Sequence, residues 1–478
     1  MFSPLRRGRS APALIVCLIL LTGCAGHRST MEGVRAALLQ EDLDAARAVL
    51  ADAGRGTDDL LFALEDGLLL HVVGDPELSN SRLEFAEQRI DELYTKSISR
   101  AALSLISSDL VLKYEPRGIE NFLINHYRAL NYLQLGAVEE AWVEWRKLAA
   151  KLRFSRDQGD APYLDPPFFD YVAGLGLESD DANEAYISLR LAEAAYRDRE
   201  QVPPAELIED LLRLAADLGF GDHLDYYQSE YGEAMRPGTA RAGPSESSGG
   251  RWGEVVVVIE EGLVAPIEEL QVYLPITRER AELVAGGDRG AQLELSQNLA
   301  GEFHAGRYKG VDRSYAGRRE IAYVLPLAFP VFGRGEAAFE SLAATAGADT
   351  IPARPLLEVS KLQGAAFQDG LLGIYAKTIA RALLKYAVAS ELRDEAEEEG
   401  GDAAGDVVGV VANLVNVLTE RADTRAWLGL PHRIWVARLT VSAGIHQLGV
   451  LVDDKEKIDF GEIEVLPGER LFVSYRIF

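Results

Sequence analysis

The chain has 478 residues, of which 48% are hydrophobic, and its 49 basic and 75 acidic side chains give a formal net charge of −26 at pH 7. This acidic balance repels nucleic-acid phosphates and argues against a nucleic-acid partner, while the hydrophobic content is that of a globular protein and not of a disordered acidic tail. The length predicts two or three domains.

The N-terminus has the pattern of a bacterial lipoprotein leader. Arginines, and no acidic residue, precede an apolar run over residues 11–21, which is shorter than the roughly 20 residues needed to span a bilayer. The run ends in Leu21-Thr22-Gly23-Cys24, which matches the signal-peptidase recognition box of lipoproteins. We predict a signal peptide over residues 1–23 and lipid attachment, palmitate included, at Cys24; the alternative is an ordinary signal peptide with a chance cysteine.

The only charged residues that cleavage before Cys24 removes are arginines, so the mature chain of 455 residues has a net charge near −29. It keeps one cysteine because Cys17 lies in the leader. A single acylated cysteine excludes a disulfide, a thiolate metal site and a catalytic thiol. Several acyl chains anchor a protein firmly, since each buried methylene contributes about 0.8 kcal/mol. Ala25, in place of Asp, favours the outer membrane with the protein facing the periplasm, and residues 24–30 are expected to form a short tether.

Residues 31–231 have the apolar spacing of helices. In the clearest stretch, Leu83, Ala86, Ile90 and Leu93 fall on one helical face at i, i+3, i+7 and i+10. Prolines between such stretches separate one predicted helix from the next. We therefore predict an all-α domain over this range.

Part of this range resembles a tetratricopeptide repeat, a pair of antiparallel helices with small residues at their contact and a glycine at the turn. Ala129, Tyr132, Gly136 and Ala141 have the spacing of the repeat, although Arg153 stands where its last proline is expected. We predict a TPR-like helical domain; a plain helical bundle is the alternative. Helical repeats usually bind a peptide or a protein. The candidate partner-binding side chains here are Tyr127, Tyr132, Trp142 and Trp145.

The second half has the patterns of strands. A Gly-, Ser- and Pro-rich linker is expected over residues 232–252, followed by an α+β domain over 253–478 with an antiparallel, sandwich-like sheet. Two helices, at about 371–392 and 407–419, interrupt the sheet, and the acidic run between them is expected to be a solvated loop. The predicted strands cover residues 254–259, 271–274, 321–327, 433–441, 445–452 and 471–475.

The first of these two helices carries a basic stripe, Lys377, Arg381 and Lys385, at i, i+4 and i+8. The stripe is a candidate site for an anionic partner. The alternative is a solvated face whose charges pair with nearby acids such as Glu395 or Glu398.

No motif indicates catalysis. The seven histidines are too far apart for a zinc signature, and the chain has neither a Gly-x-Ser-x-Gly elbow nor a Ser-x-x-Lys motif. Ala376-Lys377-Thr378 lacks the glycines of a phosphate loop. We expect no catalytic residue, no metal and no cofactor, and a protein that is not an enzyme. A pair of carboxylates in a glycosidase-like site is the alternative.

Three motifs resemble an uncharacterised family of proteobacterial lipoproteins with a TPR-like first half. They are Tyr127-Arg-Ala-Leu-Asn-Tyr-Leu-Gln-Leu-Gly136, Glu261-Gly-Leu-Val-Ala-Pro266 after a valine-rich strand, and Thr419-Glu-Arg-Ala-Asp-Thr-Arg-Ala-Trp427. The resemblance implies a role in the envelope, with a link to cell-wall assembly through activators of penicillin-binding proteins.

The last motif contains Asp423, Arg425 and Trp427. We expect these residues to have a structural role, with an ion pair beside an aromatic ring; a binding site is the alternative. Together these features predict an anchored envelope lipoprotein that acts as a protein-interaction scaffold or adaptor. The alternatives are an enzyme that acts on peptidoglycan or another glycan, and a purely structural tether.

Overall fold

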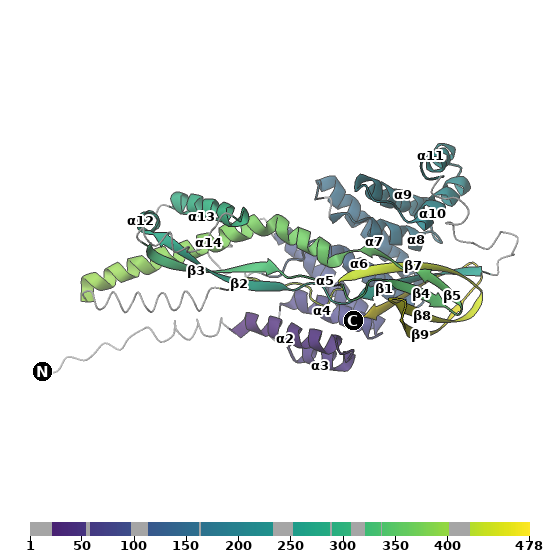
Figure 1. Cartoon of the computed structure of the whole chain (residues 1–478), viewed down its shortest axis with the longest axis horizontal. Helices are drawn as coiled ribbons and strands as arrows, with labels where there is room; N and C mark the ends of the chain where they lie inside the picture. Colours follow the sequence, from purple (N-terminus) through teal and green to yellow (C-terminus); the bar gives the residue numbers. More distant parts are fainter. Residues whose placement is uncertain are drawn as a thin grey trace.

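The computed structural model describes residues 22–53, 58–96, 113–161, 164–232, 252–286, 289–306, 321–335, 337–400 and 421–478. Residues 1–21 of the predicted leader (1–23), the predicted helix at 407–419 and nearly all of the predicted linker lie outside these ranges. Figure 1 shows an elongated molecule with two parts, which we name the body and the arm. The body holds the N-terminal helices and most strands, and the arm projects from it.

Successive helices of the body pack against each other as pairs, α2 with α3, α4 with α5, and so on to α10 with α11. The all-α prediction for the first half is confirmed. The bounds of these helices are α2 Thr22–Leu38, α3 Leu43–Ala53, α4 Asp59–Val72, α5 Pro76–Lys96, α6 Glu120–Gln134, α7 Val138–Gln158, α8 Pro167–Leu177, α9 Ala182–Asp198, α10 Ala205–Asp217 and α11 Gly221–Tyr231.

Small residues let the paired helices approach closely. A Cβ on Gly67 of α4 would lie 2.8 Å from the side chain of Leu83 in α5, and a Cβ on Gly174 of α8 would lie 2.7 Å from that of Leu189 in α9. Between α6 and α7 the chain reverses at Gly136, whose φ of 70° is open to glycine at no steric cost. The helix–turn–helix predicted around Gly136 is therefore present.

The chain is helical further towards its N-terminus than the sequence suggests. Residues 24–30, expected to form a tether, are the first part of α2. Later in this helix Met31, Val34 and Leu38 are buried in one cluster with residues of α3 and α4. Burial of this face stabilises α2 as a whole, because packing of an amphipathic face, more than intrinsic propensity, holds short helices together.

In the described ranges the strands form three sheets. Their orders are β10-β1-β7-β6, which we name the inner sheet, β5-β4-β8-β9, the outer sheet, and β2-β3, the ribbon. Neighbours are antiparallel, as predicted, except that β10 runs parallel to β1. The bounds are β1 Trp252–Glu261, β2 Ile267–Thr277, β3 Ile321–Phe332, β4 Leu342–Ala346, β5 Asp349–Pro352, β6 Arg354–Leu357, β7 Arg433–Ser442, β8 Gly444–Val452, β9 Glu456–Val465 and β10 Arg470–Ile477.

The inner sheet is buried on both faces. Val255, Val257 and Ile259 of β1 share a core with the outer sheet, while Val256 and Val258 share the large core that contains the helices α4 to α11. A strand covered on both sides needs apolar residues at every position, which explains the unbroken valine run. The body therefore has three layers: helices, inner sheet and outer sheet.

The arm consists of the ribbon and the helices α12 Arg278–Ala285, α13 Arg289–His304 and α14 Val359–Gly400. Apolar side chains from all five elements form its core. Helix α14 starts at the body and runs to the far end of the arm (Figure 1). It includes the predicted helix at 371–392 and continues through the acidic residues 393–400, so the loop expected there is helical. Glu and Ala, which dominate this stretch, are strong helix formers.

Within the part of the chain that the structure describes, no helix combines the length and the apolar character needed to cross a bilayer.

Candidate functional sites: a partner groove and a basic cleft

Two of the aromatic residues predicted to bind a partner are core residues. Tyr127 is 0% exposed and its ring packs edge-on against Trp427, with centroids 6.2 Å apart. Trp145 is 1% exposed and lies 5.3 Å from Phe472 of β10. The prediction is wrong for these two, because the inner sheet covers the side of the helices that carries them. Tyr132 and Trp142 are partly buried against the same core.

Arginines of the inner sheet join it to the helices. Arg438 Nη1 donates to Asp210 Oδ2 of α10 at 2.6 Å, and its Nε donates to Glu254 Oε1 at 2.7 Å. Arg470 Nε donates to Glu254 Oε2 at 2.6 Å, and its Nη1 donates to Glu178 at 2.8 Å. Burial opposes ionisation of Glu254, but the two guanidinium groups outweigh it and hold its pKa well below the usual range.

Arg476 of β10 completes this set, which we name the interface arginines: Arg438, Arg470 and Arg476. Its Nη1 donates to Glu260 at 2.7 Å, and its Nη2 donates to the carbonyl oxygens of Gly262 and Gly429. Each interface arginine thus faces a carboxylate, and the network fixes the inner sheet in place.

Two buried carboxyls of the body with raised pKa, Glu65 and Glu120, are also structural. Burial raises the pKa of Glu65 to about 8, and its two oxygens accept the backbone N–H groups of Leu428 and Gly429 at 2.6 and 2.9 Å. Burial also raises the pKa of Glu120, which accepts from the Tyr114 hydroxyl at 2.6 Å. Both side chains are almost fully buried. They hold chain segments and do not face a cleft that a substrate enters.

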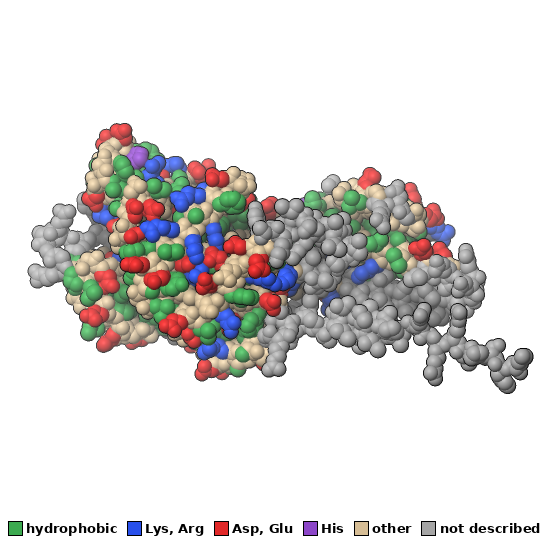
Figure 2. Space-filling model, turned by 180° about the vertical axis from the view of Figure 1, so that it is seen from behind, with side chains coloured by type: hydrophobic (Ala, Val, Ile, Leu, Met, Phe, Trp, Pro, Cys, Tyr) green, Lys and Arg blue, Asp and Glu red, His purple; other side chains and the backbone are tan. Residues whose placement is uncertain are grey.

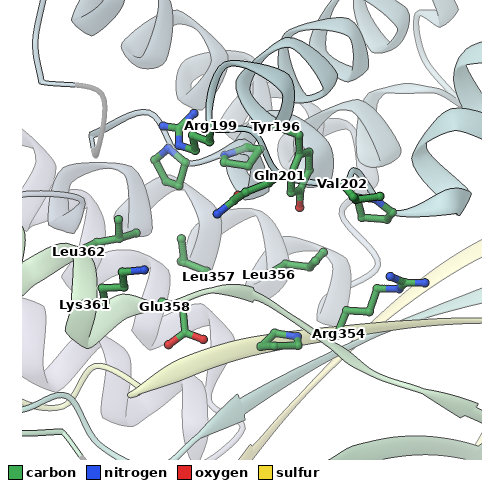
Figure 3. A pocket seen from close by; sticks show the side chains of 14 residues that line it. Tyr196, Arg199, Gln201, Val202, Arg354, Leu356, Leu357, Glu358, Lys361 and Leu362 are labelled. Carbon is green, nitrogen blue, oxygen red and sulfur yellow. The ribbon is translucent and has the colours of Figure 1, made fainter. Parts of the chain in front are cut away.

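A cavity of about 560 Å³ is a groove where the two halves of the chain meet; we name it the partner groove. Figure 3 shows side chains of the α9–α10 connection on one side, facing those of β6 and the start of α14 on the other. Its lining residues are Pro166, Pro167, Tyr196, Arg199, Gln201, Val202, Pro204, Arg354, Pro355, Leu356, Leu357, Glu358, Lys361 and Leu362.

The walls of the partner groove are fixed by hydrogen bonds. Arg199 donates to the carbonyl oxygens of Ala195 and Asp165, which ties the end of α9 to the segment before α8. On the other side, Ser360 N donates to the His432 carbonyl oxygen at 3.1 Å, which ties the start of α14 to the segment before β7. The groove is therefore preformed.

Apolar and cationic side chains share this groove. Val202 is 87% exposed, an unusual position for a valine. Arg354 and Lys361 are exposed, and within the described ranges neither has an acidic partner within 4 Å. Glu358, the one acidic residue of the described lining, lies 3.9 Å from Arg433 Nη1. The groove thus offers an apolar surface with uncompensated positive charge.

A second cavity, of about 270 Å³, lies where the arm joins the body; we name it the basic cleft. Lys377 and Arg381 of the predicted stripe line it, while Lys385 does not belong to its lining. Arg381 is buried, so the stripe is not a uniformly solvated face. The described lining residues are Lys113, Tyr114, Glu115, Pro116, Arg117, Pro330, Ile374, Lys377, Thr378, Arg381, Arg421, Ala422, Asp423 and Arg425.

The predicted ion pair of the last motif is present at the edge of this cleft. Arg425 Nε and Nη2 donate to Asp423 Oδ1 and Oδ2 at 2.9 and 2.8 Å. Trp427 is not beside this pair but buried against Tyr127. Sequence analysis missed Lys113, Arg117 and Arg421, which come from segments far apart in the chain and join the stripe only after folding.

Among the described side chains, no group of three or more His, Cys, Asp or Glu residues is arranged to hold a metal ion. On the face of the body drawn in Figure 2, acidic and basic side chains are interspersed.

The chain was compared with known proteins. No protein-family model matches it, and no curated protein sequence matches it. Among solved structures, it is similar to a crystal structure of the apo form of RapI with a TM-score of 0.31 and 12% sequence identity, over 44% of this chain and 71% of that chain.

Proposed function

We propose that this protein is a lipid-anchored envelope lipoprotein that serves as a scaffold, and that it binds an extended, acidic segment of a partner protein in the partner groove. The observation that carries the proposal is the groove itself: an apolar surface with two exposed cations, Arg354 and Lys361, that lack acidic partners in the described part of the chain. An apolar surface contributes affinity, and uncompensated charge selects an acidic partner.

The groove favours recognition through side chains over addition of a strand. Strand β6 is an edge of the inner sheet, and an edge strand is the usual template for an added strand. Here the strand is four residues long and contains Pro355, which has no N–H to donate.

We infer a TPR-like class for the helical pairs and a sandwich-like class for the inner and outer sheets. The close approach at Gly67 and Gly174 and the turn at Gly136 support the first, because small residues at the helix contact are typical of these repeats. The apolar core shared by the two sheets supports the second.

A photo-cross-linking amino acid at Val202 tests the groove in living cells. We expect it to capture an identifiable acidic segment of one envelope protein, because position 202 is 87% exposed inside the groove. The yield is expected to fall at least tenfold in an Arg354→Glu, Lys361→Glu variant. The same cross-linker at Arg47, an exposed position of α3, is the control. Capture of the same segment from position 47, or of basic segments only, contradicts the proposal.

The anchor is tested separately. We expect Cys24→Ala to abolish labelling with palmitate and retention in the membrane fraction, because the thiol that accepts the lipid is lost. Cys17→Ala is the matched control, since that cysteine lies in the predicted leader, and it is expected to leave both unchanged. Labelling that survives Cys24→Ala contradicts the lipoprotein assignment, and recovery with the inner membrane contradicts the outer-membrane part.

A further inference from the structure

We propose that the basic cleft is a binding site for a phosphate-bearing anion, independent of the partner groove. Cationic residues from three separate segments converge on it in a protein whose overall charge is −26. The described lining has only two acidic residues, Glu115 and Asp423. The cationic side chains of that lining are Lys113, Arg117, Lys377, Arg381, Arg421 and Arg425.

Two carboxylates beside the basic cleft, Glu120 and Asp58, accept hydrogen bonds from other groups. Glu120 accepts from the Tyr114 hydroxyl, from Arg117 N at 3.0 Å and from Gln363 Nε2 at 3.0 Å. Asp58 caps helix α4 by accepting from Leu60 N and also accepts from Tyr114 N. These acids hold the backbone of the cleft, and Asp58 Oδ2 also lies 3.7 Å from Arg425 Nη1.

On the far wall, carboxylates pair with two of the cationic lining residues. Glu269 accepts Ala422 N at 2.8 Å and lies 3.4 Å from Arg421 Nη1, while Asp423 is taken by Arg425. Within the described ranges, Lys113, Arg117 and Lys377 have no acidic side-chain oxygen within 4 Å of their cationic groups. Three cationic side chains without a close ion pair in the described ranges thus line one cavity, beside the acids Glu115 and Glu120.

The guanidinium group of Arg117 is partly buried. The Nη1 atom of Arg117 is buried and has no hydrogen-bond partner in the described structure. A buried guanidinium donor without a partner is costly, and a bound anion is one way to satisfy it. The position of Arg117 is fixed because the next residue, Gly118, has a φ of 56° and lies so close to α14 that a Cβ there would collide with Gln363 Oε1.

The chemistry of the lining favours phosphate. Guanidinium groups match phosphate oxygens in pairs, and lysine adds a point charge. A cavity of about 270 Å³ suits a compact group such as a phosphate or a pyrophosphate. The same group occurs in soluble phosphorylated compounds and in the headgroups of anionic phospholipids, and the experiment separates these sources.

The test uses the full mature protein in detergent. Inorganic pyrophosphate is titrated by calorimetry, and binding to vesicles of phosphatidylglycerol is compared with binding to vesicles of phosphatidylcholine by flotation. We expect saturable binding in one of the two experiments. The affinity is expected to be at least tenfold lower in the Lys377→Met variant, and also at least tenfold lower in the Arg117→Met variant. Pyrophosphate binding assigns a soluble ligand; phosphatidylglycerol binding that depends on both residues assigns a headgroup.

The matched control is Lys361→Met, an exposed lysine on the same helix that lies in the partner groove. It is expected to leave anion binding unchanged, while the cleft variants leave cross-linking at position 202 unchanged. Circular dichroism and the thermal midpoint verify folding, and Lys377→Glu gives a second variant at an exposed site. The proposal is overturned if neither anion binds, or if binding is equal in wild type and in the Lys377 and Arg117 variants.

Discussion

The interface arginines and the basic cleft use the same side-chain chemistry in opposite ways. At the interface, the guanidinium groups of Arg438, Arg470 and Arg476 each lie 2.6–2.8 Å from a carboxylate. In the cleft, the neighbouring Glu120 accepts backbone and hydroxyl donors, and Arg117 and Lys377 have no acidic side-chain oxygen within 4 Å in the described structure. The difference separates cations that hold the fold from cations that are available to a ligand.

The interface also explains why the two halves of the chain form one body. Apolar burial alone brings α8 and α10 to the inner sheet, but the orientation of the sheet is specified by Arg438 and Arg470, which each contact carboxylates from both halves. A buried ion pair adds little net stability over a well-packed apolar pair, yet it penalises arrangements that leave a charge unpaired.

The largest expected effect comes from breaking the interface. Arg438→Met removes one guanidinium and leaves Asp210 and Glu254 buried with fewer partners, so we expect a loss of about 3–5 kcal/mol in the free energy of unfolding, measured by denaturant titration. Arg47→Met, at an exposed position of α3, is the control and is expected to stay within about 0.5 kcal/mol of wild type. A wild-type midpoint for Arg438→Met would show that the network is dispensable.

The next effect is a pH dependence at the same interface. The pKa of Glu65 is about 8 in the folded protein, against about 4.3 in an unfolded chain. Between these values the folded state binds the extra proton, so the free energy of unfolding falls as the pH rises from about 5 to 8, by up to a few kcal/mol. Glu65→Gln cannot lose a proton, and its stability is expected to vary less over this range. Parallel pH profiles for the two proteins would contradict the assignment.

The sequence predicts the elements better than their assembly. The period of 3.6 residues finds Leu83, Ala86 and Leu93 on the buried face of α5, and the valine run finds β1, because these signals are local. The short strand β6 carries no such signal, since four residues are too few for a period. Spacing also finds Lys377 and Arg381, but the rest of the basic cleft depends on contacts that form only between distant segments.

Tyr127 and Trp145 also show that local spacing does not predict contacts between distant segments. Their spacing is typical of a repeat, and repeats often present aromatic residues to a partner, but that spacing does not reveal which face another domain will cover. Here the second half of the chain takes the place of the partner: Phe472 of the inner sheet packs against Trp145, and Trp427, in the segment before β7, packs against Tyr127. The partner groove consequently lies at the edge of this covered face, where β6 ends the sheet.

The smallest expected effect provides the sharpest contrast with Arg438. Lys377 is exposed and has no acidic partner in the described ranges, while other cations surround it, so Lys377→Met is expected to leave the free energy of unfolding unchanged or to raise it by less than about 0.5 kcal/mol. Any gain comes from relief of repulsion and should vanish in 1 M salt, where the Debye length is about 3 Å. Denaturant titrations at low and high salt measure the change in the free energy of unfolding and its dependence on salt. A loss of more than about 1 kcal/mol would mean that Lys377 stabilises the fold, and the distinction between structural and available cations would then fail at this residue.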